Sequence, residues 1–220
     1  MFLHTGLIMQ AETPEQLKGV IAHETGHIAG GHNVTRQGAM EAASGTSLIT
    51  LGLGALALAA GAPDAAMALF GSASTFGMLT AFKFTRIEES AADQYGIDFM
   101  EKTKQSSMGL VAFMEKFRYE ELMSESRRDP YFRSHPTSTD RISALRKRAV
   151  EASVNALPQS ERSLEQLAMM KAKLVGFIGP ATRVMSKYPA SDQSIYGKYA
   201  RAIAAYRAVD IKNALKSTEE

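Results

Sequence analysis

A long run of almost uncharged residues constrains the fold of this chain more than any other feature of its sequence. Residues 42–82 are 41 residues that include six glycines and a single charged side chain, Asp64. A helix needs about 20 apolar residues to span a bilayer, and the turn signal at residues 61–64, Gly-Ala-Pro-Asp, divides the run into two shorter arms. The run therefore predicts a helical hairpin. Its small residues favour close packing on neighbouring helices, and contact with a membrane or a lid function is the alternative.

The overall composition indicates a folded protein and excludes several kinds of site. The 220 residues are 45% hydrophobic and 22% charged, which is close to the average of globular domains and predicts one main core. Basic side chains number 25 and acidic ones 23, so the charge gives no support for a nucleic-acid groove. The chain has no cysteine, which excludes disulfide scaffolds, thiolate zinc fingers, iron–sulfur clusters and cysteine nucleophiles.

The start of the chain predicts a strand followed by a well-capped helix. Residues 1–10, MFLHTGLIMQ, lack the basic start and the cleavage site of a signal peptide, and they predict a β-strand that runs into a turn at Gly6. We expect an upstream segment to be missing. Residues 13–16, Thr-Pro-Glu-Gln, form a capping box for a helix that continues through Ile28, and the glycines at 30–31 predict its end.

The rest of the chain is expected to be helical. Apolar residues at helical spacing predict helices at about residues 86–104 and 108–119 and a third that carries Ile142, Leu145 and Val150. Pro158 marks a boundary. We expect a first domain over residues 1–150 and a helical extension over residues 151–220.

The end of the chain carries a weak repeat signal. The segment from Tyr199 to Glu220 consists of a helix rich in small residues, a tight turn near Val209-Asp210 and a second helix with Ala214. This pattern resembles half of a tetratricopeptide repeat, although Val209 stands where the turn usually has glycine. An ordinary helical hairpin explains it equally well, because one partial repeat cannot establish a period.

The segment His23-Glu24-Thr25-Gly26-His27 is an H-E-x-x-H motif within the first predicted helix. Two histidines four residues apart project from one face of a helix and can bind one metal ion. Neutral imidazole suits Zn²⁺, and a catalytic zinc takes three protein ligands and a water molecule. Glu24 would take a proton from that water and deliver it to the leaving amine. A chance match on a surface helix is the alternative, but ionisable groups among apolar neighbours are costly unless a metal pairs with them.

The third zinc ligand distinguishes between classes of metallopeptidase. A histidine ligand in the register of H-E-x-x-H-x-x-G-x-x-H is not available, because that position holds Asn33 and His32 is one residue early. A glutamate from a later helix is the other solution, and Glu89 begins an E-x-x-x-D motif. Asp93 lies one turn further on the same face and would accept a hydrogen bond from a zinc-bound histidine. Glu88 is adjacent to Glu89, but no acidic residue follows it four positions later.

Three segments together carry a family resemblance. They are TGLIMQAETPEQLKGVIAHETGHIAGGH, RIEESAADQYGIDFM and SHPTSTDRI, and over residues 1–150 they resemble the HtpX and CAAX-prenyl-endopeptidase family of zinc metallopeptidases. The soluble BepA-type members with C-terminal tetratricopeptide repeats look most similar. The resemblance implies a predominantly helical α+β fold of the gluzincin type, with a small edge-exposed sheet over the active-site helix. It also implies one Zn²⁺ per chain and hydrolysis of peptide bonds in protein substrates.

The resemblance further implies roles for individual residues. His23, His27 and Glu89 would bind zinc, Glu24 would act as general base and acid, and Asp93 would orient a histidine. His135, in Ser134-His135-Pro136, would stabilise the oxyanion or else occupy the open zinc position and keep the enzyme latent. The expected substrate-binding residues are Leu3, His4 and Thr5 on a strand beside the cleft, with Tyr131 and Arg141 as weaker candidates for work on the oxyanion.

The expected biology follows from the same resemblance. The short hairpin of residues 42–82 favours a soluble or peripheral enzyme in the bacterial periplasm, with possible membrane contact through that hairpin and no nucleic-acid partner. Its role would be quality control or assembly of envelope proteins, with partners bound by the C-terminal helices. The alternative function is a latent zinc protein that serves as a scaffold or chaperone-like binding protein through those helices.

Overall fold

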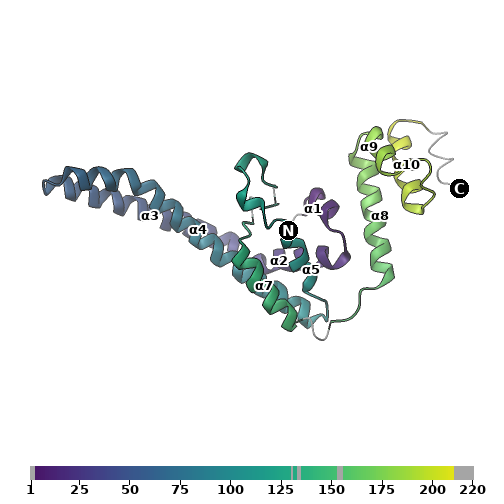
Figure 1. The fold of residues 1–220 in the computed structure, drawn as a ribbon, viewed down its shortest axis with the longest axis horizontal. Helices are drawn as coiled ribbons and strands as arrows, with labels where there is room; N and C mark the ends of the chain where they lie inside the picture. Colours follow the sequence, from purple (N-terminus) through teal and green to yellow (C-terminus); the bar gives the residue numbers. More distant parts are fainter. Residues whose placement is uncertain (1–2, 130, 133–134, 153–155, 211–220) are drawn as a thin grey trace. The chain divides into compact units, whose positions relative to one another are not determined.

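Helices form all of the regular structure in the part of the chain that is described. The computed structural model describes residues 3–129, 131–132, 135–152 and 156–210 (Figure 1). The chain divides into two compact units, one of residues 1–17 with 157–220 and the other of residues 18–156.

The expected strand at the start of the chain is not formed among the described residues. Thr5–Gln10 is a helix, α1, and His4 precedes it with an extended backbone. A strand is stable only when its backbone groups pair with another strand, and no strand is present in residues 3–129, 131–132, 135–152 or 156–210. The prediction of an α+β fold with a small sheet is therefore wrong for this part of the chain, while its predominantly helical character is confirmed.

The capped helix that carries the H-E-x-x-H motif is confirmed as α2, Pro14–Ala29. The Thr13 hydroxyl accepts a hydrogen bond from the backbone N–H of Gln16 at 3.2 Å, and the Gln16 side chain accepts one from the N–H of Glu12 at 2.8 Å. These bonds satisfy N–H groups that a helix start leaves free. The helix ends at the predicted glycines, where Gly31 has a φ of 67°. Such a left-handed residue allows the next helix to leave in a new direction.

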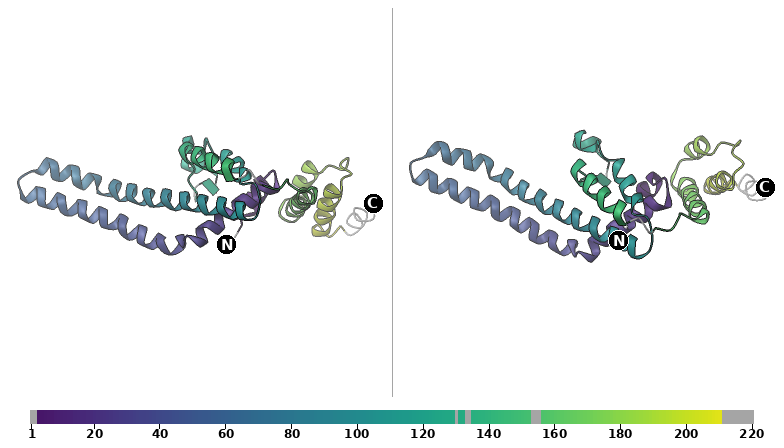
Figure 2. Two further views of the ribbon diagram at one scale, coloured as in Figure 1. Left: turned by 90° about the horizontal axis from the view of Figure 1, so that it is seen from below. Right: turned by 60° about the horizontal axis from the view of Figure 1, so that its bottom comes forward.

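The predicted hairpin is confirmed and is longer than expected. Helix α3, His32–Ala59, and helix α4, Pro63–Lys102, lie side by side along their length (Figures 1 and 2). The turn between them lies where the sequence predicted it, and Gly61 has a φ of 78°. The separate helix expected at about residues 86–104 is instead the second half of α4. Residues 83–90 contain no glycine or proline, so the backbone has no reason to break there.

The expectation that the hairpin packs on neighbouring helices is wrong for most of its length. Leu48 and Leu56 of α3 are each 67% exposed, and Met67 of α4 is 71% exposed. Helix α3 instead packs mainly on α4, and Figure 2 shows the turn end of the pair extending away from the rest of residues 18–156.

The core of residues 18–156 lies at the other end of α4. Helix α7, Thr139–Ala152, contacts both α4 and α5, Met108–Glu115. Two short 3-10 turns, Glu120–Leu122 and Glu125–Arg127, lie between α5 and α7 in the chain. The largest fully buried side chains include Val20, Ile97, Leu110, Phe113, Met114 and Ile142. Ile142 and Leu145 are buried as expected, whereas Val150 is exposed.

The other unit has a small core of its own. It contains α8, Glu161–Ile178, α9, Ala181–Lys187, and α10, Ile195–Arg207, in addition to α1. Buried Ala172, Val175, Val184 and Ala200 form the centre, and Met9 of α1 packs against them. A turn follows α10 at Val209, whose φ is 60°. The second helix expected around Ala214 lies outside the described residues, so the tetratricopeptide repeat and the domain boundary stay predictions.

Candidate zinc site

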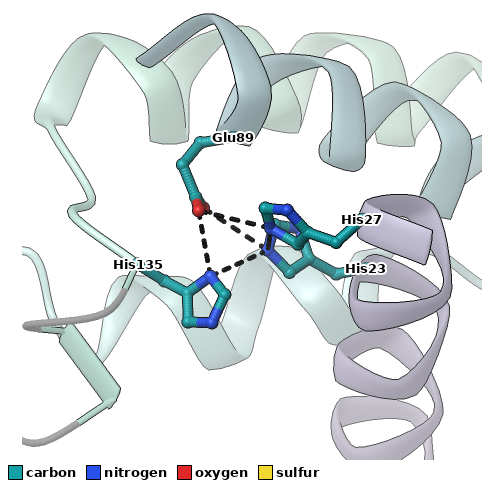
Figure 3. Close-up of side chains that lie close together, drawn as sticks. All are labelled: His23, His27, Glu89 and His135. Carbon is teal, nitrogen blue, oxygen red and sulfur yellow. Dashed lines mark hydrogen bonds and ion pairs between the residues drawn. The ribbon is translucent and has the colours of Figure 1, made fainter. Parts of the chain in front are cut away.

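Side chains from three parts of residues 18–156 converge on one point. Helix α2 supplies His23 and His27, α4 supplies Glu89, and the segment before α7 supplies His135 (Figure 3). One nitrogen or oxygen atom of each of these residues lies within 4.8 Å of the others. The three ligands expected from the motifs are therefore brought together, and His135 adds a fourth donor.

The Glu89 carboxylate lies between the three imidazoles. Its Oε1 atom is 3.2 Å from His27 Nε2 and 3.0 Å from His135 Nδ1, and its Oε2 atom is 3.4 Å from His23 Nε2. The Nε2 atoms of His23 and His27 are 3.1 Å apart. His23 and Glu89 are both buried, whereas His27 and His135 are partly exposed. The donors thus converge closely enough to share one ion at the edge of the core.

A close approach of α2 and α4 brings the two motifs together. A Cβ atom on Gly26, inside the H-E-x-x-H motif, would lie 2.5 Å from the carbonyl oxygen of Ala92. A Cβ atom on Gly96 would lie 3.1 Å from the backbone nitrogen of His23. Helices with side chains at both contacts would be held further apart, because real Cβ atoms essentially never approach backbone as closely as at Gly26 and seldom as closely as at Gly96. The glycines therefore set the distance between the histidines and Glu89.

Asp93 orients the first histidine, as the E-x-x-x-D motif predicts. Its Oδ1 atom lies 2.9 Å from His23 Nδ1, so His23 donates through Nδ1 and its Nε2 atom faces the other donors, where a metal would displace any proton on it. Arg141 in turn holds the aspartate, because its Nε and Nη2 atoms donate to the two oxygens of Asp93 at 2.7 and 2.8 Å. Its Nη1 atom is 2.8 Å from Glu89 Oε2. Arg141 thus fixes both carboxylates of the motif.

A second orienting residue was not identified from the sequence. His32 Nδ1 lies 2.8 Å from Nδ1 of His27, on the opposite side of that ring from Glu89. The left-handed turn at Gly31 returns the chain so that the His32 ring lies against Gly30, where a Cβ atom would collide with it. His32 is therefore a partner of a predicted ligand. The glycine pair at residues 30–31 was the available signal. It predicts a helix stop and permits a bend that brings His32 back, but His32 is out of register for a zinc ligand and the sequence gives no other role for it.

Glu24 and His135 face each other beside the donor set. The Glu24 Oε1 atom is 3.3 Å from His135 Nε2, and both side chains are partly exposed. The Tyr131 ring stacks on the His135 ring with centroids 4.7 Å apart, and its other neighbours are Phe113 and Phe117. His135 is thus held between an aromatic cluster and the two glutamates.

The remaining predicted residues are located as follows. Glu88, the rejected alternative to Glu89, accepts a hydrogen bond from the Thr35 hydroxyl at 2.6 Å and is not among the donors. Leu3, His4 and Thr5 belong to the unit that contains α8–α10, whereas all four donors lie in residues 18–156. Their expected role in substrate binding stays a prediction.

The charges of the site favour a cation at its centre. Burial opposes protonation of His23, but the carboxylates of Asp93 and Glu89 outweigh it and raise the pKa of His23 to about 9. Burial likewise opposes ionisation of Glu89, yet hydrogen bonds from the imidazoles of His135, His23 and His27 hold its pKa well below the usual range. Two ionised carboxylates therefore remain next to His23, and they attract a proton or a metal ion.

The residues around the four donors also have shifted pKa values. Burial opposes ionisation of Asp93, but Arg141 and His23 lower its pKa. Burial also disfavours the charged guanidinium of Arg141, and the neighbouring Asp93 and Glu89 raise its pKa above the ordinary range. Burial and the nearby His27 lower the pKa of His32, which keeps that imidazole neutral and able to accept from His27. Burial, with Glu24 close by, raises the pKa of Tyr131 well above its usual value.

The chemistry of the donor set fits zinc. Three imidazole nitrogens and one carboxylate oxygen are ligands that Zn²⁺ prefers. Ca²⁺ and Mg²⁺ take mainly oxygen ligands, so the same set is a poor site for either.

Comparisons with known proteins agree with this chemistry. The family described as Peptidase family M48 matches residues 1–149. The beta-barrel assembly-enhancing protease of Escherichia coli is 27% identical over 79% of this chain and 34% of its own length. The metalloproteases LoiP and YcaL of the same organism are each 30% identical over 66% of this chain, which is 54% and 53% of their lengths. The chain thus spans between a third and about half of these relatives. No solved structure gives a significant match.

Proposed function

Because the chain belongs to peptidase family M48, we propose that it is a zinc-dependent metalloendopeptidase that hydrolyses peptide bonds in protein substrates. The observation that carries this proposal is the convergence of His23, His27 and Glu89 next to the carboxylate of Glu24. A purely structural zinc site has no need of a base beside its ligands.

The residues of the site have separate roles in the proposed hydrolysis. Zinc bound by His23, His27 and Glu89 would polarise a peptide carbonyl and make a water molecule acidic near neutral pH. Glu24 accepts the proton of the attacking water and donates it to the leaving amine. Asp93 and Arg141 hold His23 and Glu89 in place, so that the ligand geometry is fixed before a substrate arrives.

We infer that His135 acts as a removable fourth ligand. Its Nδ1 atom lies 3.0 Å from Glu89 and 3.5 Å from His23 Nε2, within the donor set itself. With zinc bound, His135 in this arrangement would take the place that a water molecule and a substrate carbonyl need, and the site would be latent. A role on the oxyanion would require the His135 ring to leave the donor set and face the substrate.

Replacement of His135 distinguishes these roles. If His135 blocks the site, His135→Ala raises the rate of casein cleavage and leaves one zinc per chain. If His135 stabilises the oxyanion, the same variant loses activity, by about 10²-fold or more. Cleavage of casein by the wild type and the variant, each with zinc content measured, decides between them.

The central experiment combines metal analysis with a variant of the base. Purified protein should contain about one zinc per chain after dialysis without chelator. Glu24→Gln should keep that zinc and lose cleavage of casein, since the amide cannot accept the proton. Activity that persists in Glu24→Gln would exclude the proposed mechanism, and a chain that takes up no zinc would exclude the site.

We propose the bacterial periplasm as the compartment and envelope proteins as the substrates. The relatives named beta-barrel assembly-enhancing protease support a role in assembly or quality control of envelope proteins. Helices α8–α10 are the candidate surface for assembly partners. Cleavage of misassembled envelope proteins in cells, compared between the wild type and Glu24→Gln, tests this role.

The fourth donor also supports a second candidate function. A zinc closed permanently by His23, His27, Glu89 and His135 would be structural, and the chain would serve as a latent scaffold that binds partners through its C-terminal helices. Failure of both the wild type and His135→Ala to cleave casein, with zinc bound in each, would favour this function over the peptidase.

A further inference from the structure

The halves of α3 and α4 next to their connecting turn distribute small and large apolar side chains in the reverse of the pattern found in a water-soluble helix pair. We define residues 42–59 of α3 and 63–82 of α4 as the apolar arms. In a soluble pair, large apolar residues fill the seam between the helices and charged residues cover the outside. The apolar arms instead place small residues in the seam and large apolar residues outside.

Small side chains line the seam between the two arms. The buried positions include Ala43 and Thr50 on α3 and Ala66, Ala73 and Gly77 on α4. A Cβ atom on Gly77 would collide with the Ser47 hydroxyl and lie 2.9 Å from the Ala43 carbonyl oxygen. Close backbone approach through small residues is how helices associate within membranes, where apolar burial gives no driving force.

Large apolar side chains cover the outside of the arms. Exposed fractions are 67% for Ile49, 59% for Met78 and 56% for Leu79. The other exposed large apolar residues of the arms are Leu48, Leu51, Leu53, Leu56, Leu58, Met67, Phe76 and Phe82. Phe70 is an exception, because its ring lies against Gly54 of α3 and its exposed fraction is only 37%. Soluble monomers rarely expose a continuous apolar surface of more than a few hundred Å². This surface therefore requires an apolar environment.

Five of the eight hydroxyl groups of the arms donate hydrogen bonds inside the hairpin, while Ser44, Ser74 and Thr75 are exposed. The hydroxyls of Thr46, Ser47 and Thr50 donate to backbone carbonyls one turn back, at 2.8 to 3.2 Å. Thr80 donates to Thr46 across the seam at 3.3 Å. Internal pairing of polar groups is what a hydrocarbon environment demands, because no water is present to replace it.

We propose that the apolar arms insert into a lipid bilayer. Residues 42–59 rise about 27 Å and residues 63–82 about 30 Å, which matches a hydrocarbon core of about 30 Å. Both helices are long and apolar enough to cross a membrane. Asp64, the only charge of the arms, lies at the turn and reaches the far surface when the arms are inserted.

The charge pattern defines where the insertion ends. Lys83 and Arg86 are the first charged residues of α4 after Asp64, and they lie one and four residues after Phe82. Basic side chains at this level bind anionic lipid headgroups, and an aromatic ring suits the interface. On α3 the first charge below the arm is Glu41, whose carboxylate accepts from Gln37 at 3.2 Å. Charged residues thus flank the base of both arms.

A bilayer explains the exposed surface better than a second copy of the chain does. A dimer contact would bury only one face of the hairpin. On α3, however, residues 51–53, 55–56 and 58–59 are all exposed, and they point in most directions around the helix axis. Lipid can surround the whole outside of the hairpin at once.

The insertion restricts the substrates of the proposed peptidase, and this consequence rests on the proposed function. Glu89 follows Phe82 by seven residues of the same helix, a rise of about 10 Å. The zinc donors therefore lie just above the bilayer surface. The substrates are then proteins that lie on the membrane or emerge from it.

Tryptophan fluorescence tests the insertion directly, because the chain contains no tryptophan. Phe76→Trp places a reporter in the arm, and Phe177→Trp in α8 is a matched control, since the two phenylalanines are 45% and 47% exposed. Each protein is mixed with vesicles of phosphatidylcholine and phosphatidylglycerol, with and without bromine on the phosphatidylcholine acyl chains. We expect the brominated vesicles to quench most of the Phe76→Trp fluorescence and none of the Phe177→Trp fluorescence.

Two outcomes would overturn the proposal. Equal quenching of both variants would mean general adsorption, and no quenching of Phe76→Trp would mean that the arms stay out of the bilayer. If sedimentation also showed a dimer in the second case, the exposed surface would be assigned to self-association.

A charge variant gives an independent measurement. Ile49→Glu should keep its helical circular dichroism, because the side chain is exposed, and should float with vesicles at least about tenfold less well. Unchanged flotation of this variant would contradict insertion. Glu24→Gln should float as the wild type does, so a failure of the proposed protease activity is distinguishable from a failure of membrane insertion.

Discussion

At the scale of single residues, Arg141 connects the two motifs of the site. Its guanidinium donates to both oxygens of Asp93 and also pairs with Glu89, and a planar group with five N–H donors is required for these contacts. We expect Arg141→Lys to lower zinc affinity by about 10- to 100-fold, because an ammonium cannot fix both carboxylates at once. Competition for zinc with a coloured chelator measures this loss.

A second arginine of α7 is a matched control. Arg148 pairs with Asp98 at 3.3 Å and Glu101 at 3.5 Å, also on α4, but its partners are half exposed and lie outside the donor set. Arg148→Lys should leave the zinc affinity unchanged. An equal loss in both variants would mean that arginines of α7 act only through general stability.

The sequence predicted those residues of the site that lie close together in the chain, on the same helix. His23 and His27, or Glu89 and Asp93, are four residues apart on one helix, so their shared face follows from helix geometry. His32 could not be found in this way, because its contact with His27 depends on the left-handed turn at Gly31. The double contact of Arg141 depends on how α7 packs on α4, which no spacing in the sequence specifies.

At the scale of the helices, the contact of α2 with α4 sets the width of the site. Gly26 leaves no room for a side chain against Ala92, so Gly26→Ala should push the helices apart. We expect this variant to lose about 1–3 kcal/mol of folding free energy, as overpacked cores do, and to bind zinc less tightly because His27 moves away from Glu89. Chemical denaturation and zinc content measure the two effects.

Gly38 provides the control for helix propensity. It lies in α3 with open space around it, so Gly38→Ala should stabilise the protein by up to about 1 kcal/mol and leave zinc binding unchanged. If Gly26→Ala behaved in the same way, the close approach of α2 and α4 would not control the site.

Element boundaries were predictable where the backbone itself changes. The Thr13 cap, the Gly31 turn and the Gly61 turn each need particular residues, and the structure has them where the sequence predicted. The helix break expected before Arg86 was based on a change from apolar to charged residues. Such a change affects what surrounds a helix, but it does not interrupt the backbone hydrogen bonds, and α4 continues through it. The expected strand at residues 1–5 required a partner strand that the sequence of residues 1–10 could not reveal.

At the scale of the whole molecule, the two compact units should unfold separately. Each has a buried core of its own, and the zinc donors all belong to residues 18–156. A metal bound only to the folded state stabilises it by about 3 kcal/mol at a hundredfold excess over its dissociation constant. Calorimetry should therefore resolve two transitions, and a chelator should lower the midpoint of one of them.

Restoring zinc checks that this shift comes from the metal. Added zinc should return the lowered midpoint to its original temperature and leave the other transition unaffected. A single transition, or an equal shift of both, would mean that the two units unfold as one.

The seven-residue spacing in the hairpin seam limits how the hairpin can change during evolution. Ala43 and Thr50 on α3, and Ala66 and Ala73 on α4, each lie two helical turns apart. A single inserted residue near the base would rotate everything beyond it by about 100° and turn small residues out of the seam. Insertions at the turn disturb little, and matched insertions of seven residues in both arms restore the pattern. Homologous hairpins should therefore differ in length at their free end and in steps of two turns.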